Sequence, residues 1–381
     1  TMNHDWEKKR LDNVCSIKSG YTPSFDDLSS NGEFPYFKVA EMNLPGNEKY
    51  LINTPSYLSG NIKTFPANSI VFPKNGAAVS TNKKRILQVD SVVDLNTAVM
   101  IANQSVSVNY LYYILISIDF VNLVKRGAVP TLNISELKNT VVSVPPMHVQ
   151  EQIVSELDKI NELIAIKRSQ LKDLDALAQS LFNETFSSIG ETVPLSFYVN
   201  ALVGGKSLAS KEVSPNKVLK SGAVTYDYFD KNSTKYLPVD YTPDAEHSVS
   251  TGDLIISRMN TAELVGACAY VFDVDDNVYL PDRLWRIEYK SNANPIYLWK
   301  SLISESAKWQ IRSKASGTSG SMKNISKPLL LSINIKKVPI SIQQQFAERI
   351  EAIEAQKKLV EASIADLETL LASRMDYWFN D

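Results

Sequence analysis

The sequence is poor in the residues that build disulfide frameworks and metal sites. It contains 2 cysteines, Cys15 and Cys268, and 3 histidines among 381 residues. The cysteines fall in different halves of the chain, and the histidines are scattered. So few thiols and imidazoles indicate neither a disulfide framework nor a zinc site. We therefore expect a reducing, cytoplasmic environment, with no metal and no other cofactor.

Long apolar runs and a strong net charge are missing as well. No apolar run approaches the length of a membrane span, and no signal-peptide pattern opens the chain, so we expect no membrane association. The net charge of −2 hides a division. Residues 1–145 and 189–339 carry +2 and +3, whereas 146–188 and 340–381 carry −3 and −4. This division is compatible with nucleic acid meeting only the basic segments.

Two acidic segments repeat each other. The helical parts of 144–186 and 338–379 align at an offset of 193, and each segment opens on Val-Pro. Each follows roughly 140–150 residues of α/β-type sequence, an ordinary size for one domain. The duplication predicts globular modules at 1–145 and 189–339, and long helices at 146–188 and 340–381.

Both helices carry apolar residues at alternating spacings of four and three, which is the seam of a coiled coil. The first seam falls on Ile153, Leu157, Ile160, Ile164, Lys167, Leu171, Leu174, Ala178 and Leu181, and the second on Phe346, Ile350, Ile353, Lys357, Val360, Ile364, Leu367, Leu371 and Arg374. Lys167 and Lys357 do not share a repeat position. We expect an antiparallel pair related by a pseudo-twofold axis, because this packing carries the modules to opposite ends. The alternative is two ordinary amphipathic helices lying on their own modules, but such helices rarely keep a strict seam over nine positions.

The modules repeat each other less closely. Residues 67–72 correspond to 251–256 at an offset of 184, as a turn before a buried strand. Residues 110–112 correspond to 297–299 at 187, as the start of a short helix, and 133–135 correspond to 324–326 at 191. The stretches between these matches differ, such as 74–88 against 257–276. Similar frameworks with unlike loops indicate two modules with unlike targets.

These features together resemble the specificity (S) subunit of type I restriction-modification systems, over essentially the whole chain. Gln150-Glu151-Gln152 is similar to the family's "EQ" element after the prolines, and 344–347 keep the glutamine without the glutamate. Residues 19–23 resemble its "G-x-T-P" turn, and 252–254 its "GD-aliphatic" strand start. The departures are Asn68-Ser69 in place of Gly-Asp, and residues 204–207 in place of a clean G-x-T-P.

The resemblance implies an α+β protein with two target-recognition domains joined by an antiparallel helical spacer. It implies a role in defence against foreign DNA, with each domain reading one half of an asymmetric bipartite double-stranded site. It further implies a complex with two methyltransferase (M) subunits, to which restriction (R) subunits can add.

The residues themselves suggest no catalytic site. Pro281-Asp282 and Glu288-Tyr289-Lys290 imitate a nuclease motif, but five intervening residues are too few to place the acids on neighbouring strands. Residues 204–207 end like a phosphate-binding loop without its first glycine. Neither a glycine-rich S-adenosylmethionine fingerprint nor an (Asp/Asn)-Pro-Pro-aromatic element is present. We therefore expect methyl transfer and DNA cleavage to belong to partner subunits.

The candidate DNA contacts are polar and basic residues in predicted turns and loops. Lys and Arg neutralise phosphates or bind guanine, Asn and Ser/Thr read base edges, and glycine allows close backbone approach. In the first module they are Gly20, Tyr21, Thr22, Lys74, Asn75, Lys83, Lys84, Arg85, Lys125, Arg126 and Gly127; in the second they are Ser257, Arg258, Arg312, Lys314, Ser316, Gly317 and Thr318.

For each candidate, a solvated surface side chain is the competing interpretation. Of Arg283 and Arg286, around Trp285, we expect at least one to serve a structural pairing. The rival for the whole protein is a non-catalytic coiled-coil scaffold whose modules bind protein or carbohydrate. Such a ligand-binding module should show clustered aromatic residues in a cleft, whereas basic loops beside acidic helices favour DNA.

Overall fold

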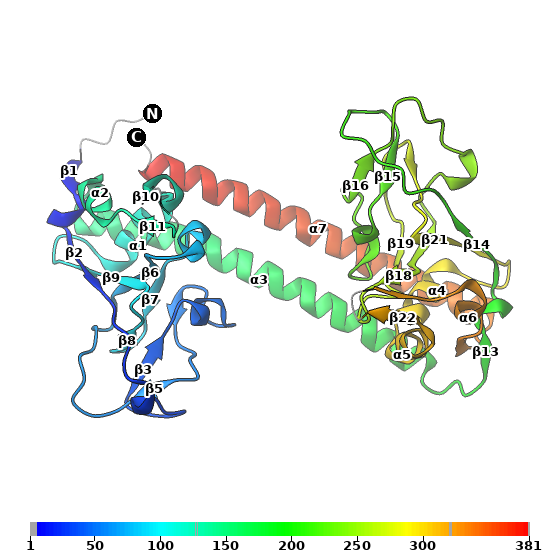
Figure 1. The fold of residues 1–381 in the computed structure, drawn as a ribbon, viewed down its shortest axis with the longest axis horizontal. Coiled ribbons are helices and arrows are strands. Elements are labelled where there is room, and N and C mark those ends of the chain that lie inside the picture. Colours follow the sequence, from blue (N-terminus) through cyan, green and yellow to red (C-terminus); the bar gives the residue numbers. More distant parts are fainter. Residues whose placement is uncertain (1–5, 126, 128, 320–321, 380–381) are drawn as a thin grey trace. The chain divides into compact units, whose positions relative to one another are not determined.

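The computed structural model describes residues 6–125, 127, 129–319 and 322–379. These form two compact units, unit 1 from residues 1–169 with 361–381, and unit 2 from residues 170–360. Each unit contains one globular module and parts of the two long helices α3 (Met147–Phe186) and α7 (Ile340–Phe379) (Figure 1).

Unit 1 is built on a five-stranded sheet with a smaller three-stranded sheet, here called lobe 1. The large sheet has the order β2 (Cys15–Ser19), β9 (Thr97–Ala102), β6 (Ile70–Pro73), β7 (Arg85–Leu87) and β4 (Tyr50–Leu51). Lobe 1 has the order β5 (Tyr57–Leu58), β3 (Phe34–Phe37) and β8 (Val92–Val93). Two further pairs join β1 (Glu7–Arg10) to β12 (Val141–Val144), and β10 (Val124–Lys125) to β11 (Thr131–Leu132).

Unit 2 repeats this plan. Its large sheet has the order β14 (Val199–Gly204), β21 (Leu284–Tyr289), β17 (Leu254–Ser257) and β19 (Cys268–Tyr270). Lobe 2 has the order β16 (Thr234–Tyr236), β15 (Lys217–Leu219) and β20 (Val278–Tyr279). The remaining strands are β18 (Met259–Asn260), β23 (Met322–Asn324) and β22 (Ser316–Ser319) in one sheet, and β13 (Thr192–Pro194) with β24 (Asn334–Lys336) in another.

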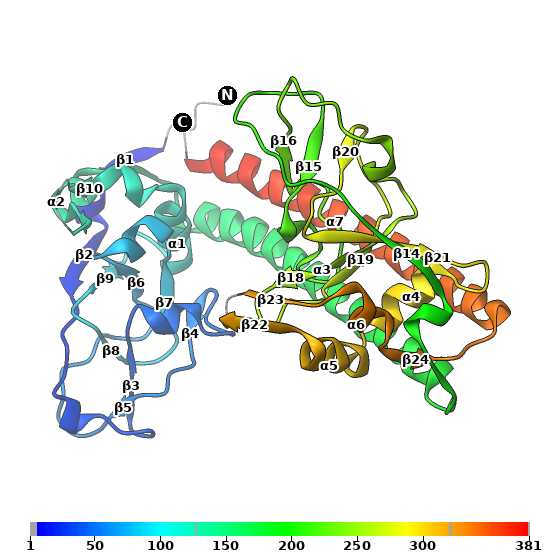
Figure 2. The same ribbon diagram turned by 45° about the vertical axis from the view of Figure 1, so that its right-hand side comes forward.

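The two lobes have the same strand pairing. In lobe 1, β3 is antiparallel to β5 and parallel to β8, and in lobe 2, β15 is antiparallel to β16 and parallel to β20. Both views place β3 and β5 at the end of unit 1 farthest from α2 (Ile134–Asn139), and β15 and β16 at the end of unit 2 farthest from α5 (Glu305–Lys314) (Figures 1 and 2).

The predicted short helices are confirmed at the predicted offset of 187. Helix α1 (Val108–Ser117) is N-capped by the Ser107 side chain, and α4 (Pro295–Leu302) by Asn294. The first tyrosine of each helix is buried and donates to a backbone carbonyl of the strand that precedes a long helix. Tyr110 Oη lies 3.0 Å from the oxygen of Ser143, and Tyr297 Oη lies 2.5 Å from that of Lys336.

The departure at Asn68 leaves the turn geometry intact. Asn68 has φ 61° and Gly252 has φ 97°, so both occupy the left-handed region that glycine and asparagine tolerate. Asn68 N–H donates to Leu87 and Gly252 N–H to Val271, each at 2.9 Å. The predicted correspondence at an offset of 184 is therefore confirmed.

One predicted correspondence is wrong. Asn133 is the N-cap of α2, and its structural counterpart is Ser326, the N-cap of α6 (Lys327–Leu331), at an offset of 193 rather than 191. The matching residues 324–326 begin two positions before Ser326, where the structural counterpart of 133–135 begins. The offset grows from 187 to 193 because unit 2 contains α5 where unit 1 has only the short turn Phe120–Leu123.

The long helices confirm the seam. Each has 40 residues, or about 60 Å at 1.5 Å per residue. All the seam positions are buried or partly buried, whereas most positions between them are exposed. Within the described residues, no helix combines the length and the apolar character needed to cross a membrane.

Within each unit, α3 and α7 run antiparallel. In unit 1, Glu156 pairs with Arg374, and Arg168 pairs with Glu368 at 2.7 Å, so numbers rise along α3 as they fall along α7. In unit 2, Lys357 pairs with Asp175 at 2.8 Å. Seam residues also belong to the module cores, with Ile153 and Leu157 in unit 1 and Phe346, Ile350 and Ile353 in unit 2. The helices therefore pack on each other and on the modules.

A buried glutamine joins each module to its long helix. In unit 1, Gln150 accepts from Ser107 N–H at 2.8 Å and donates to the carbonyls of Pro145 and Ser105 at 2.9 and 3.1 Å. In unit 2, Gln343 accepts from Asn294 N–H at 2.8 Å. Its amide also donates to the carbonyls of two residues at 2.8 and 3.1 Å, Val338 and Asn292.

Candidate nucleic-acid interface

A basic residue follows the same central strand in each unit. Lys74 follows β6, and its N–H donates to Asn96 while its carbonyl accepts from Leu132, both at 2.8 Å. Arg258 follows β17 and is held in the same way by two residues at 3.0 Å, Arg283 and Ile325. The repeat therefore places one cation at the same point of both frameworks.

In unit 1, Lys74 lies among other polar candidates. Its ammonium donates to Ser19 Oγ at 2.7 Å, and burial lowers its pKa, an effect that Asp94 opposes. Asn75 forms a β-bridge with Thr131, which pairs in turn with the exposed Lys125. We call Lys74, Asn75 and Lys125 polar edge 1. Gly127 is exposed beyond it, and Arg126 lies outside the described residues.

In unit 2, Arg258 lies beside a polar hairpin. Its guanidinium stands 5.4 Å from the Trp285 ring, and its Nε is buried without a hydrogen-bond partner in the described part of the chain. Strand β18 continues from Arg258 and pairs with β23, which pairs with β22. Lys323 on β23 donates to the Gly317 carbonyl at 3.0 Å. We call Arg258, Asn260 and Lys323 polar edge 2.

The remaining candidates of unit 2 lie on α5, just before this hairpin in the chain, and on β22, the first strand of the hairpin. Arg312 is exposed and donates to the Glu263 carbonyl at 2.6 Å, and Lys314 ends the helix half-buried. Ser316 and Gly317 are exposed, and a Cβ at Gly317 would collide with the Met322 carbonyl. Thr318 is in β22, but its side chain lies outside the described residues.

The basic run Lys83-Lys84-Arg85 does not form one exposed patch. Lys84 is fully buried; its ammonium donates to Asn82 Oδ1 and to the Ile118 carbonyl and lies 3.9 Å from the Phe120 ring centre. Burial lowers its pKa to about 7. The prediction that Lys84 contacts DNA is therefore wrong, because the side chain is part of the module interior.

The side chains of Lys83 and Arg85 form hydrogen bonds within the module. Arg85 donates to the carbonyls of Met42 and Lys84 at 3.0 and 2.8 Å, and burial lowers its pKa. Lys83 is half-exposed and donates to Asn43 Oδ1. Of the three, Lys83 has the most accessible position for a phosphate.

The turn Gly20-Tyr21-Thr22 packs against a neighbouring strand. Gly20 is buried, and a Cβ there would collide with the Asp94 carbonyl. Tyr21 N–H donates to Val93 at 2.9 Å, and Thr22 Oγ1 donates to Asp94 Oδ2 at 3.0 Å. Burial works to raise the Asp94 pKa, but hydrogen bonds from Asn96, Thr22 and Tyr36 lower it below its usual value.

Unit 2 has a turn related to Gly20-Tyr21-Thr22, although its residues 204–207 do not match the G-x-T-P pattern. A bulge at the start of β14 adds one residue, so Gly205 takes the place of Gly20, and a Cβ there would collide with the Leu280 carbonyl. The Ser207 hydroxyl pairs with Asp282, much as Thr22 pairs with Asp94. Asp282, the acid of the nuclease-like motif, thus has a structural partner.

Two further expectations have clear outcomes. Ser257 is fully buried in β17, so the prediction that it contacts DNA is wrong. Arg286 donates to the carbonyls of Ser248 and Glu246 at 2.7 and 2.9 Å, which confirms a structural pairing for one of the two arginines. Across the described residues, no group of three or more His, Cys, Asp or Glu side chains is placed to hold a metal ion.

Two α+β modules with matching frameworks and unlike polar edges, together with a pair of antiparallel helices, define a class of proteins built from two similar modules. The family model described as "Type I restriction modification DNA specificity domain" matches residues 3–175 and 205–369. The match spans most of the chain. This protein therefore belongs to the type I restriction-modification specificity family.

One relative agrees with this assignment. The chain is 22% identical over 182 residues to the specificity subunit of type I restriction enzyme MjaIX from Methanocaldococcus jannaschii. That match covers 46% of this chain and 42% of the relative, so it spans less than half the length of that protein.

Two solved structures share the fold. The S subunit of a type I restriction-modification system from M. genitalium has a TM-score of 0.59 at 15% identity, covering 100% of this chain and 98% of that one. A chain from a structural study of complex assembly and conformational transition of the type I R-M system has a TM-score of 0.58 at 16% identity, covering 97% and 96%.

Proposed function

We propose that this chain is the DNA-reading subunit of a type I restriction-modification complex, in which each unit reads one half of an asymmetric bipartite site. The observation that carries the proposal is the repeated placement of a cation, Lys74 or Arg258, after the central strand of two matching frameworks. The residues around these cations differ. A shared framework with different polar edges suits two readers of unlike sequences.

The chemistry of the edges supports unlike half-sites. Arg258 can bind guanine O6 and N7 through two hydrogen bonds, and its buried unpaired Nε calls for a ligand or a water molecule. In unit 1, Asn75 has the amide that pairs with adenine N6 and N7, while Lys74 and Lys125 suit phosphates. The two halves of the site should therefore differ in sequence.

The long helices supply the constant element of the site. Each is a single helix of 40 residues that begins in one unit and continues into the other. The seam and the interhelical ion pairs hold α3 and α7 together in each unit. We infer that this spacer sets the gap between the half-sites, because a coiled coil keeps a fixed length.

The outer surfaces of the helices suit two copies of one partner. Ile166 and Leu177 are exposed on α3, and Leu359 and Leu370 are exposed on α7, one repeat of 193 residues later. Residues 11 apart lie on nearly the same helix face. A duplicated apolar face fits two identical methyltransferase subunits, to which restriction subunits add in the full complex.

Catalysis then belongs to the partners, and this chain acts by placing them on DNA. The experiment compares methyl transfer to duplex DNA by this chain alone, by its proposed methyltransferase partner alone, and by both together. Sequence-specific transfer should require both proteins. Transfer by this chain alone, or equal transfer by the methyltransferase without it, would refute the proposal.

The scaffold alternative gains no support from the cavities of unit 2. Neither the cavity of about 460 Å³ nor the one of about 250 Å³ is lined by clustered aromatic rings, and three cationic residues line each of them. Such a lining suits anions better than carbohydrate.

A further inference from the structure

We propose that lobe 2 contains a binding site for the phosphodiester backbone of duplex DNA, formed by Lys220, Lys235 and Arg283. This inference rests on the proposed function and adds a contact region that the sequence did not indicate. Lys220 precedes a turn, Lys235 lies in β16, and Arg283 precedes β21, so the three cations come from distant parts of the chain.

The three cations surround one cavity. It has a volume of about 460 Å³, and its lining also includes Ser207, Ser221, Asp282, whose carboxylate accepts from the Ser207 hydroxyl, and apolar residues such as Leu208 and Val218. All three cationic residues are exposed. Within the part of the chain that the structure describes, their side chains have neither an ion-pair partner nor a hydrogen-bond partner. Exposed cations around one hollow are suited to hold phosphate oxygens.

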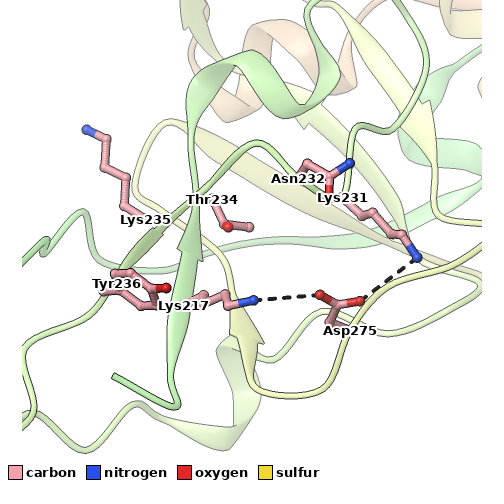
Figure 3. Close-up of a pocket in the computed structure, with 7 residues that line it drawn as sticks. All are labelled: Lys217, Lys231, Asn232, Thr234, Lys235, Tyr236 and Asp275. Atoms are coloured by element: carbon pink, nitrogen blue, oxygen red, sulfur yellow. Dashed lines mark ion pairs between the residues drawn. The ribbon is translucent and has the colours of Figure 1, made fainter. Parts of the chain in front are cut away.

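Nearby lysines show which charges are already compensated. Asp275 lies between Lys217 and Lys231, at 3.7 and 3.9 Å, and Lys231 also pairs with Asp273 at 2.7 Å. Figure 3 shows this bridge in the neighbouring cavity, with the Lys235 side chain pointing away from it. Lys235 lines both cavities, and its charge remains available to an external anion.

The cavity adjoins polar edge 2. The carbonyl of Arg283 accepts the N–H of Arg258 at 3.0 Å, so these two arginines lie on hydrogen-bonded neighbouring segments. A duplex whose bases meet Arg258 would bring backbone phosphates close to Arg283. The site is therefore continuous with the proposed base-reading position.

The described residues of unit 1 have no matching set. Asn96 takes the place of Arg283 beside Lys74, and it donates to Asp94 at 2.9 Å. The part of lobe 1 in residues 21–66 has 3 Lys+Arg against 5 Asp+Glu, whereas the part of lobe 2 in residues 205–250 has 6 against 6. Unit 2 should thus supply more of the salt-dependent binding than unit 1.

The test measures DNA affinity against salt concentration for the complex of this chain with its methyltransferase. The variant Lys220→Ala/Lys235→Ala is compared with Lys38→Ala/Lys63→Ala, which removes two exposed lysines of lobe 1. Each lost phosphate contact lowers the log–log slope by about 0.9. The lobe 2 variant should lose nearly two units of slope, and the lobe 1 variant should match wild type.

The outcomes separate this inference from the proposed function. Wild-type complex that binds DNA without salt dependence would refute the proposed function itself. Wild-type binding with an unchanged slope in the lobe 2 variant, or an equal loss in the lobe 1 variant, would overturn only the lobe 2 site. Thermal unfolding of both variants checks the fold, which should be unaffected because these four lysines are exposed. Arg283→Ala, tested alone, should lower the slope by about one unit.

Discussion

Replacing the buried Gln343 with leucine should strongly destabilise unit 2. The glutamine is fully buried at the start of α7 and satisfies three backbone groups. Its carbonyl oxygen accepts the N–H of Asn294, the residue that caps α4, and its amide donates to the carbonyls of Val338 and Asn292. Leucine has a similar volume, so the main loss is these hydrogen bonds.

The size of the effect follows from the three groups left without a partner. Each buried unsatisfied backbone group costs about 1–3 kcal/mol. With partial relaxation, Gln343→Leu should lower the free energy of unfolding by roughly 3–6 kcal/mol. At about 2–4 °C for each kcal/mol in a domain of this size, the unfolding midpoint of unit 2 should fall by roughly 10–20 °C.

Gln344 offers a matched control on the same helical turn. It is exposed, so Gln344→Leu should change stability by less than about 0.5 kcal/mol. Calorimetry of wild type and both variants measures the difference, and DNA binding below the transition shows whether α4 still positions the module. If Gln343→Leu unfolds within about 1 kcal/mol of Gln344→Leu, the glutamine does not join module and helix as described.

Three further predictions concern the interior of unit 1 and the long helices. Burial lowers the Lys84 pKa from 10.5 to about 7, so between these values the unfolded chain retains a proton that the folded chain has released. Stability should therefore rise with pH across this window. Denaturant unfolding at several pH values should show this rise in wild type but not in Lys84→Met, and parallel stability–pH curves for the two proteins would contradict the prediction. Four-residue insertions after both Lys167 and Val360, about 6 Å of helix, should widen the methylated gap by roughly two base pairs, and an unchanged gap would show that the helices do not set it. Leu171→Asp with Ile364→Asp places charge in the seam and should abolish assembly with the methyltransferase in light scattering while both modules stay folded; normal assembly would refute the pairing.

The sequence predicted the long helices well because their pattern is local. A seam spaced by four and three residues identifies the buried face of one helix without knowledge of its partner. The duplicated domain plan was predicted for the same reason, because the repeat can be recognised in the sequence without knowing which residues come into contact. The alignment of the two modules was predicted less accurately. Because unit 2 contains the additional helix α5, the structural counterpart of Asn133 is Ser326 and not Asn324, which the matching residues suggested.

The interface was harder to predict because burial depends on distant contacts. Lys84 looks like part of an exposed basic run, yet its ammonium meets the Ile118 carbonyl and the Phe120 ring. Conversely, Lys220, Lys235 and Arg283 are separated in the sequence and meet only through the pairing of β15 with β16 and the position of β21. The Gln-rich helix start was recognised, but the hydrogen bonds single out Gln150 and Gln343.

The central claim is that the two units read two different half-sites, and mapping the methylated sequence tests it most directly. Cells that contain this chain and its methyltransferase should methylate one bipartite motif with two unlike halves and a constant gap. Arg258→Ala should relax one half and Asn75→Ala should relax only the other, because these side chains are the proposed base readers of different units. An uninterrupted or symmetric motif, or two variants that alter the same half, would contradict this account.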